Sequence, residues 1–205
     1  MKFVSHLDMN RYMMRLIKTS NIPVWYTEGF NQHIYLTFAL PLSLGVTSDY
    51  DCFDLKITDD GFGNEQIKDA LNLKAAEGIK IIAVQEPWMK VSELKYAGYT
   101  LIYKDDDTEL LKKLEAMLLG NVIIAEKKGK KNKVTVLNVA EKIKSIETDL
   151  STGTLTVKVV LPAGNDENIN PSLFLQAFTS AGNPAPSFIN INRDMLYNQN
   201  FEKFE

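Results

Sequence analysis

The sequence predicts an α+β protein made of two tandem ferredoxin-like (βαββαβ) units, the first of which lacks its opening strand. Two observations lead to this expectation. Helical and strand patterns alternate along the chain in the same order in each half, and the length of 205 residues suits two domains of about 100 residues each. We place the first unit at residues 1–90 and the second at residues 91–205.

The first unit begins with a helix where a strand would otherwise come first. Apolar residues at helical spacing from Leu7 to Ser20 predict this helix, and Ser5 with Asp8 three residues later is a capping-box pattern at its start. The remaining predicted elements are a strand at 24–27, a long connection at 31–49 with a short element at 36–38, a strand at 51–58, a helix at 65–77 and a strand at 79–84.

The second unit shows the whole order of elements. Alternating residues on both sides of Ser151-Thr152-Gly153 predict a hairpin that pairs residues from Ile143 onward with 154–161. Asn170 and Pro171 suit the N-cap and first position of a helix. The other predicted elements are a strand at 96–103, a helix at 108–119, a strand at 122–125 and a last strand at 188–192.

Composition excludes several classes of protein. With 45% hydrophobic and 24% charged residues, the chain has the balance of a globular protein. A net charge of -3 gives no overall basic field, so any contact with nucleic acid must come from a local patch. The single Cys52 cannot supply a disulfide framework, a cysteine zinc site or its own iron–sulfur cluster. Without a signal peptide or a membrane-spanning stretch, we expect a cytoplasmic protein.

The two histidines, His6 and His33, give the clearest constellation with acid–base or ligand character. If the turn before His33 folds over the start of the first helix, both imidazoles could face one anionic ligand or a metal. In the competing interpretation, Ser5 and Asp8 only cap the helix, and we assign no metal ligands. The candidate ligand-binding residues are His6, Asp8, Arg11, Arg15, Glu28, Asn31 and His33.

Two further features could contact nucleic acid. A basic run offers five side chains for RNA phosphates, although a solvated hairpin tip explains it more simply. Aromatic residues near the first strand offer stacking faces for bases, although aromatic residues at strand spacing are usually core. The basic residues are Lys127, Lys128, Lys130, Lys131 and Lys133, and the aromatic ones are Trp25, Tyr26, Phe30, Tyr35 and Phe38.

Two linked motifs, Ser5-His6-Leu7-Asp8-x-x-Arg11 and Glu28-Gly29-Phe30-Asn31-x-His33, together resemble the radical-SAM-associated bacterial domain of unknown function. Members of that family are fused to, or encoded beside, a radical-SAM iron–sulfur protein. They carry one more strand before the first motif, so the start at Met1 is expected to be truncated or misassigned. They also favour proline where this chain has Gln32 and Ile34, which changes the rigidity of the loop.

The resemblance implies a context and no reaction. The iron–sulfur cluster and S-adenosylmethionine are expected on a radical-SAM partner, and no cofactor is expected in this chain. Our first hypothesis is an accessory or substrate-presenting module, with RNA as a substrate class suggested by fold analogy. The alternatives are a hydrolase or RNA-processing enzyme with His6 and His33 as acid and base, and a purely structural subunit.

Overall fold

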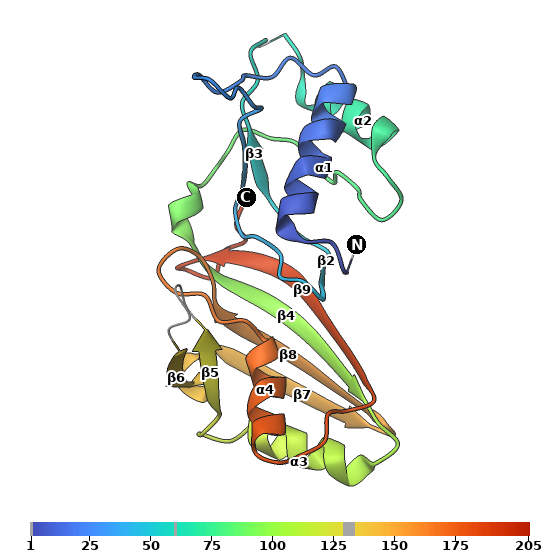
Figure 1. Ribbon diagram of the computed structural model, residues 1–205, viewed down its shortest axis with the longest axis vertical. Coiled ribbons are helices and arrows are strands. Elements are labelled where there is room, and N and C mark those ends of the chain that lie inside the picture. The colour runs from blue at the N-terminus through green and yellow to red at the C-terminus, as the bar shows by residue number, and fades with distance from the viewer. Residues whose placement is uncertain (1, 60, 129–133) are drawn as a thin grey trace. The chain divides into compact units, whose positions relative to one another are not determined.

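The structure, a computed structural model, describes residues 2–59, 61–128 and 134–205, and it confirms a mixed α+β fold (Figure 1). The chain divides into two units. The first holds residues 1–45, 51–90 and 205, and the second holds residues 46–50 and 91–204. Among the described residues, no helix has the length and apolar character needed to cross a membrane.

The second unit is built on a five-stranded sheet with the order β2-β9-β4-β8-β7. Its central strand β4 (Leu94–Lys104) pairs antiparallel with β8 (Thr154–Pro162) on one side and with β9 (Phe188–Asn198) on the other. The predicted hairpin is confirmed, because β7 (Ser145–Ser151) pairs with β8 across the expected turn. The short strand β2 (Val46–Ser48) adds to the edge, parallel to β9.

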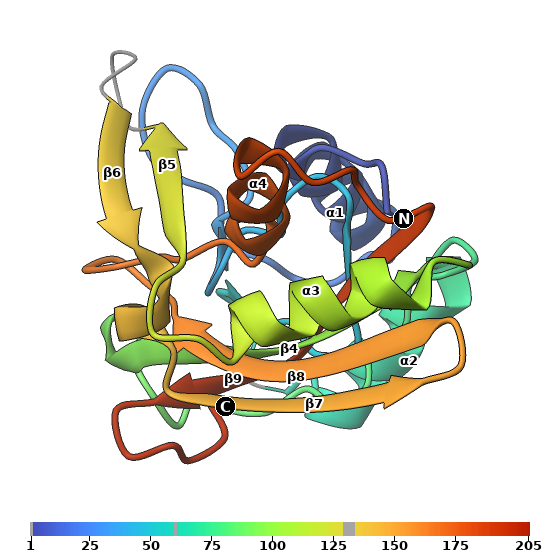
Figure 2. The same ribbon diagram turned by 90° about the horizontal axis from the view of Figure 1, so that it is seen from below.

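Two helices cover one face of this sheet, α3 (Thr108–Leu118) and α4 (Ser172–Ser180) (Figure 2). The Asp107 carboxylate caps α3 by accepting from the backbone N–H groups of Glu109 and Leu110. Beneath the helices lies a fully buried apolar layer, in which Leu101 and Tyr103 of β4 have no exposed surface. The sheet and its two helices follow the order strand, helix, strand, strand, helix, strand, but the third element is β7, because the strand predicted at 122–125 lies in a separate hairpin.

A separate antiparallel hairpin is inserted after α3, formed by β5 (Ile124–Lys128) and β6 (Val134–Asn138). It carries the basic run, whose tip at 129–133 lies outside the described residues. Two short 3₁₀ helices, η1 (Val91–Glu93) and η3 (Val139–Lys142), complete the unit. The helical turn η3 separates β6 from β7, so the chain leaves the hairpin and enters the main sheet within a few residues.

The first unit packs two helices against a small β structure. The helices are α1 (His6–Thr19) and α2 (Asn64–Lys74), and β1 (Leu36–Phe38) pairs antiparallel with β3 (Phe53–Leu55). β1 is the short element expected within the long connection. The buried core between them consists of Met13, Leu16, Ile17, Ile22, Ile34, Ile67, Leu71 and Ile81.

The strand predicted at 79–84 is wrong. The Asn72 side chain of α2 replaces a neighbouring strand, because its Nδ2 donates to the Ile81 carbonyl and its Oδ1 accepts from the Ile81 N–H, both at 2.9 Å. Ile81 is buried in the core with its backbone groups satisfied by one amide. An apolar run can therefore pack as irregular chain.

Other boundaries differ from the expectations. Residues 24–27 form isolated bridges at Val24 and Tyr26 and no continuous strand, and the strand predicted at 51–58 is reduced to β3 with a bridge at Ile57. The last strand runs to Asn198 and not to residue 192. Helix α4 begins one residue late, with Pro171 at its N-cap position. The ferredoxin-like order predicted for the first unit is not confirmed.

Gly164, just after β8, lies where the second unit leaves no room for a side chain. Its φ of +122° belongs to the region that favours glycine, and a Cβ there would meet the Leu94 carbonyl. We expect Gly164→Ala to lower the free energy of unfolding by about 2 kcal/mol or more. Gly182→Ala is the control, because its φ is also positive but no atom lies within 4 Å of its Cβ position. Chemical denaturation of both variants checks this, and equal losses would contradict it.

Candidate functional site

The start of α1 brings three residues of the first motif together. Ser5, the N-cap, accepts from the Asp8 backbone N–H at 3.2 Å, and its hydroxyl donates to the Asp8 Oδ2 at 2.6 Å. The other carboxylate oxygen of Asp8 accepts from the Arg11 guanidinium at 3.4 Å. The predicted capping interaction is thus confirmed. Because the Asp8 and Arg11 side chains remain 61% and 70% exposed, both are accessible to a ligand.

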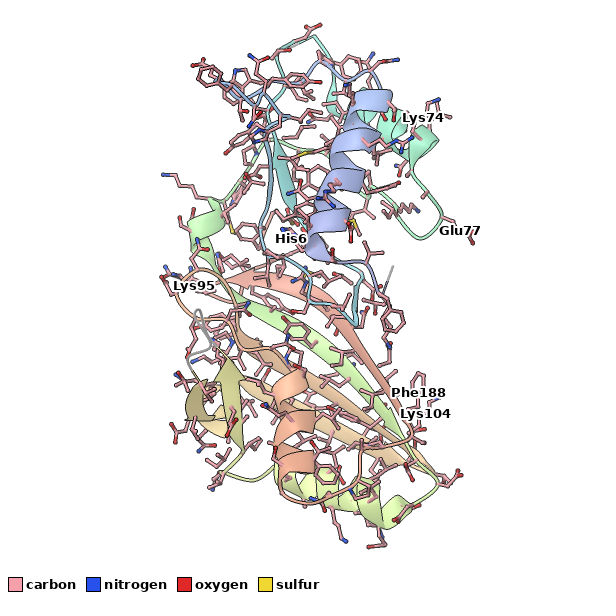
Figure 3. All side chains as sticks on the ribbon, in the orientation of Figure 1. His6, Lys74, Glu77, Lys95, Lys104 and Phe188 are labelled. Atoms are coloured by element: carbon pink, nitrogen blue, oxygen red, sulfur yellow. The ribbon has the colours of Figure 1, made fainter. Side chains whose placement is uncertain are left out.

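His6 occupies the first position of α1, where Figure 3 labels it. Its half-buried ring makes an edge contact with Phe38 of β1, with 5.3 Å between centroids, and Phe38 in turn packs against Phe53 at 5.8 Å. Part of the imidazole therefore serves to attach the helix to the β structure. Arg15 lies one turn beyond Arg11 and is exposed, so the two guanidinium groups share the solvent side of α1.

His33 closes a surface loop at residues 27–33. Its backbone exchanges hydrogen bonds with Thr27, since the Thr27 N–H donates to the His33 carbonyl at 2.8 Å and the His33 N–H donates to the Thr27 Oγ1 at 3.2 Å. His33 Nδ1 lies 3.0 Å from the Asn31 carbonyl, which can only accept, and 3.1 Å from Thr27 Oγ1, which can donate or accept. In the tautomer with its proton on Nδ1, that nitrogen donates to the Asn31 carbonyl and Nε2 is the basic nitrogen. Glu28 and Asn31 are exposed on the same loop.

The predicted site residues thus form two groups. One joins Asp8 and Arg11 at the start of α1, and the other joins Asn31 and His33 in the loop. In the part of the chain that the structure describes, no recorded contact links His6 with His33. Over the same residues, no group of three or more His, Cys, Asp or Glu side chains is placed to hold a metal ion.

The basic run has a structural task at one of its lysines. The Lys127 ammonium donates to the Asn168 carbonyl at 2.8 Å, and Lys142 pairs with Glu167 at 2.8 Å in the same loop before α4. Lys127 thereby helps to hold this loop. The backbone of Lys128 pairs with β6, and the remaining candidates lie outside the described residues: Lys130, Lys131 and Lys133.

Sequence reasoning missed two charged residues of the first unit, Asp54 and Lys56. Asp54 is half-buried, and burial raises the pKa of its carboxyl. Lys56 places its ammonium 4.5 Å from the centre of the Trp25 ring. A signal was present in the sequence, because Phe53, Leu55 and Ile57 alternate with these two residues and direct them away from the core.

Comparison with known proteins finds a family but no described activity. The model of an uncharacterized protein family conserved in bacteria, DUF2344, matches residues 1–171. A search of curated proteins finds no match. Among solved structures, a chain of a Cbf5-Nop10-Gar1 complex is similar with a TM-score of 0.47 and 9% sequence identity, and the match covers 94% of this chain and 45% of that chain.

Asp8 makes its clearest contribution through the helix start. We expect Asp8→Ala to lower the free energy of unfolding by about 1 kcal/mol, because Ser5 loses its carboxylate acceptor and the helix N-terminus loses a favourable negative charge. The control is Asp69→Ala, an exposed position within α2 where alanine suits the helix. Urea unfolding measures both variants. A loss that is no greater for Asp8→Ala than for the control would contradict the capping role.

Proposed function

The chain belongs to the DUF2344 family of uncharacterized proteins conserved in bacteria, and from this premise we propose that it is an accessory module of a radical-SAM iron–sulfur enzyme. In this proposal the chain presents a substrate to the enzyme or docks on it, and it carries out no reaction by itself. Its working surface is the exposed side of α1 with the loop at 27–33.

The observation that carries the proposal is the state of the first motif. Ser5, Asp8 and Arg11 are joined by hydrogen bonds that fix their positions, yet the Asp8 and Arg11 side chains remain mostly exposed. Capping needs Ser5 and Asp8 but does not need the guanidinium groups of Arg11 and Arg15. Arginine binds carboxylates and phosphates with two parallel hydrogen bonds, so this surface suits an anionic partner group.

The number of cysteines determines which protein holds the cluster in this proposal. A radical-SAM cluster requires three cysteine ligands, whereas this chain contains the single Cys52. The cluster and S-adenosylmethionine therefore belong to the partner in this account. The chain contributes binding and orientation, and RNA is the substrate class that we favour.

A stand-alone enzyme is the second candidate. The bond between His33 Nδ1 and the Asn31 carbonyl supports it, since Nε2 would be left as a base in solvent. This candidate requires activity from the isolated chain. Activity that disappears in His33→Ala and persists in Lys74→Ala would favour it over the accessory role.

The accessory role predicts a complex with a radical-SAM iron–sulfur protein. We expect Arg11→Ala/Arg15→Ala to weaken that complex by at least about tenfold, because charge-assisted hydrogen bonds to the partner are lost. Calorimetry with the purified partner gives the dissociation constants. Lys74→Ala, which removes an exposed cation from α2, is expected to leave the affinity unchanged.

The His6→Ala/His33→Ala variant separates the two groups of motif residues. Weakened binding in this variant as well would extend the docking surface to the loop. If the wild-type chain forms no complex, or if all variants bind equally, the accessory proposal is wrong in this form.

A further inference from the structure

Trp25 lies in a row of three side chains that crosses the β structure of the first unit. The backbone N–H of Trp25 donates to the Lys56 carbonyl at 2.8 Å, and the backbone carbonyl of Trp25 accepts from the Tyr35 N–H at 3.1 Å. Residues that are opposite each other on antiparallel strands point to the same face. The side-chain contacts agree, because the Trp25 and Tyr35 rings meet edge to face at 6.0 Å and the Lys56 ammonium lies over Trp25.

This row points away from the core of its unit. The residues that alternate with it pack with α1 and α2 in the apolar core, and they are Val24, Ile34, Leu36, Leu55 and Ile57. Tyr35 keeps 41% of its surface exposed, and Lys56 is exposed as well. We call the outward side the aromatic face, defined by Trp25, Tyr35, Asp54 and Lys56.

Asp54 gives the aromatic face an unused hydrogen-bond acceptor. It is opposite Thr37 in the register of β1 and β3, and it precedes Lys56 by two residues, so it shares the outward side. Within the described residues, no hydrogen bond or ion pair to its carboxylate is found. Because Asp54 is only half-buried, its carboxylate remains accessible to a donor group of a ligand.

Phe30 offers a further exposed aromatic ring on the same hairpin. It lies in the loop that joins the strands of Trp25 and Tyr35, next to Gly29 with its φ of +114°, and its side chain is fully exposed. Phe30 and Tyr35 are thus two large exposed aromatic side chains of this hairpin, whereas Tyr26 alternates with Trp25 and lies on the opposite side, across from Ile34.

We propose that the aromatic face binds single-stranded RNA. Bases stack on Tyr35 and Phe30, Lys56 neutralises a phosphate, and Asp54 accepts a hydrogen bond from the amino group of a base. This inference rests on the RNA part of the proposed function and deepens it by naming the residues. RNA fits better than a protein partner, because the outward groups are aromatic, cationic and carboxylate, whereas the aliphatic side chains of these strands face the core.

The acceptor at Asp54 also predicts a base preference. Cytosine carries an amino group at the position where uracil carries a carbonyl oxygen, so a carboxylate attracts the former and repels the latter. We expect the full chain to bind the octaribonucleotide rC8 about fivefold more tightly than rU8 at low salt. Fluorescence anisotropy with labelled oligonucleotides measures both affinities. Asp54→Asn is expected to remove the preference, because an amide can serve either base.

Matched variants test the stacking and the charge. Phe30→Ala and Tyr35→Ala are each expected to weaken rC8 binding about tenfold, whereas Phe3→Ala, another exposed phenylalanine of the same unit, leaves it unchanged. Lys56→Ala is expected to reduce the slope of log affinity against log salt by about 0.7, and Lys74→Ala to preserve it. Phe30 is fully exposed, so its variant remains informative even if Tyr35→Ala fails to fold.

The outcomes separate this inference from the accessory role. Absence of binding to both oligonucleotides, equal losses in Phe30→Ala and Phe3→Ala, or a preference for rU8 would overturn RNA binding at the aromatic face. The same variants are then tested for binding to the radical-SAM partner. Loss of rC8 binding with the partner complex intact supports the assignment, and rC8 binding without any partner complex leaves the inference standing while the accessory proposal fails.

Discussion

The alternation of side chains along pleated strands is the constraint on which both units depend. Successive residues of a strand point to opposite faces, and helices cover only one of them. In the second unit, Leu101 and Tyr103 of β4 are buried, while Thr100, which precedes Leu101, points to the opposite side. In the first unit, Leu36 packs in the core while Tyr35 points outward. The pattern therefore determines which residues are available to bind anything.

The two faces that point away from the helices of their own units differ in how their polar groups are used. In the second unit, Asn192 Nδ2 donates to both Asp49 at 2.7 Å and Asp194 at 2.8 Å, and the Thr100 hydroxyl donates to Asp194 at 2.6 Å. These carboxylates are held by donors of their own unit. Across the described residues, Asp54 on the aromatic face has no comparable donor. Satisfied polar networks stabilise a sheet, whereas an unsatisfied acceptor beside exposed aromatic rings favours a ligand.

Local signals in the sequence predicted much of the fold. The cap at Ser5 and the turn at Gly153 between β7 and β8 depend on neighbouring residues and were readable without the structure. The strand β2 was missed because its partner β9 lies about 144 positions away along the chain. The apolar run at 79–84 was misjudged for a related reason, because the Asn72 amide replaces a strand partner there.

In the candidate site, too, short-range features were predicted from the sequence and long-range contacts were not. The first motif was found because capping residues follow a short-range rule, but the contact of His6 with Phe38 depends on how β1 packs against α1. For Lys127 the sequence left both a phosphate contact and a solvated hairpin tip open, and only the fold shows that the Asn168 carbonyl lies beside its ammonium. The pairing of Trp25 with Lys56 arises from strand register, which hydrophobic alternation suggests but does not determine.

A titration of the ¹⁵N-labelled chain with rC8 tests the aromatic face most directly, because its two tryptophans report separately. Trp25 belongs to the aromatic face, whereas Trp88 is an exposed residue outside it. The account predicts that the indole N–H signal of Trp25 moves with added rC8 while that of Trp88 stays in place. Movement of the Trp88 signal alone, or no movement of either signal, would contradict it.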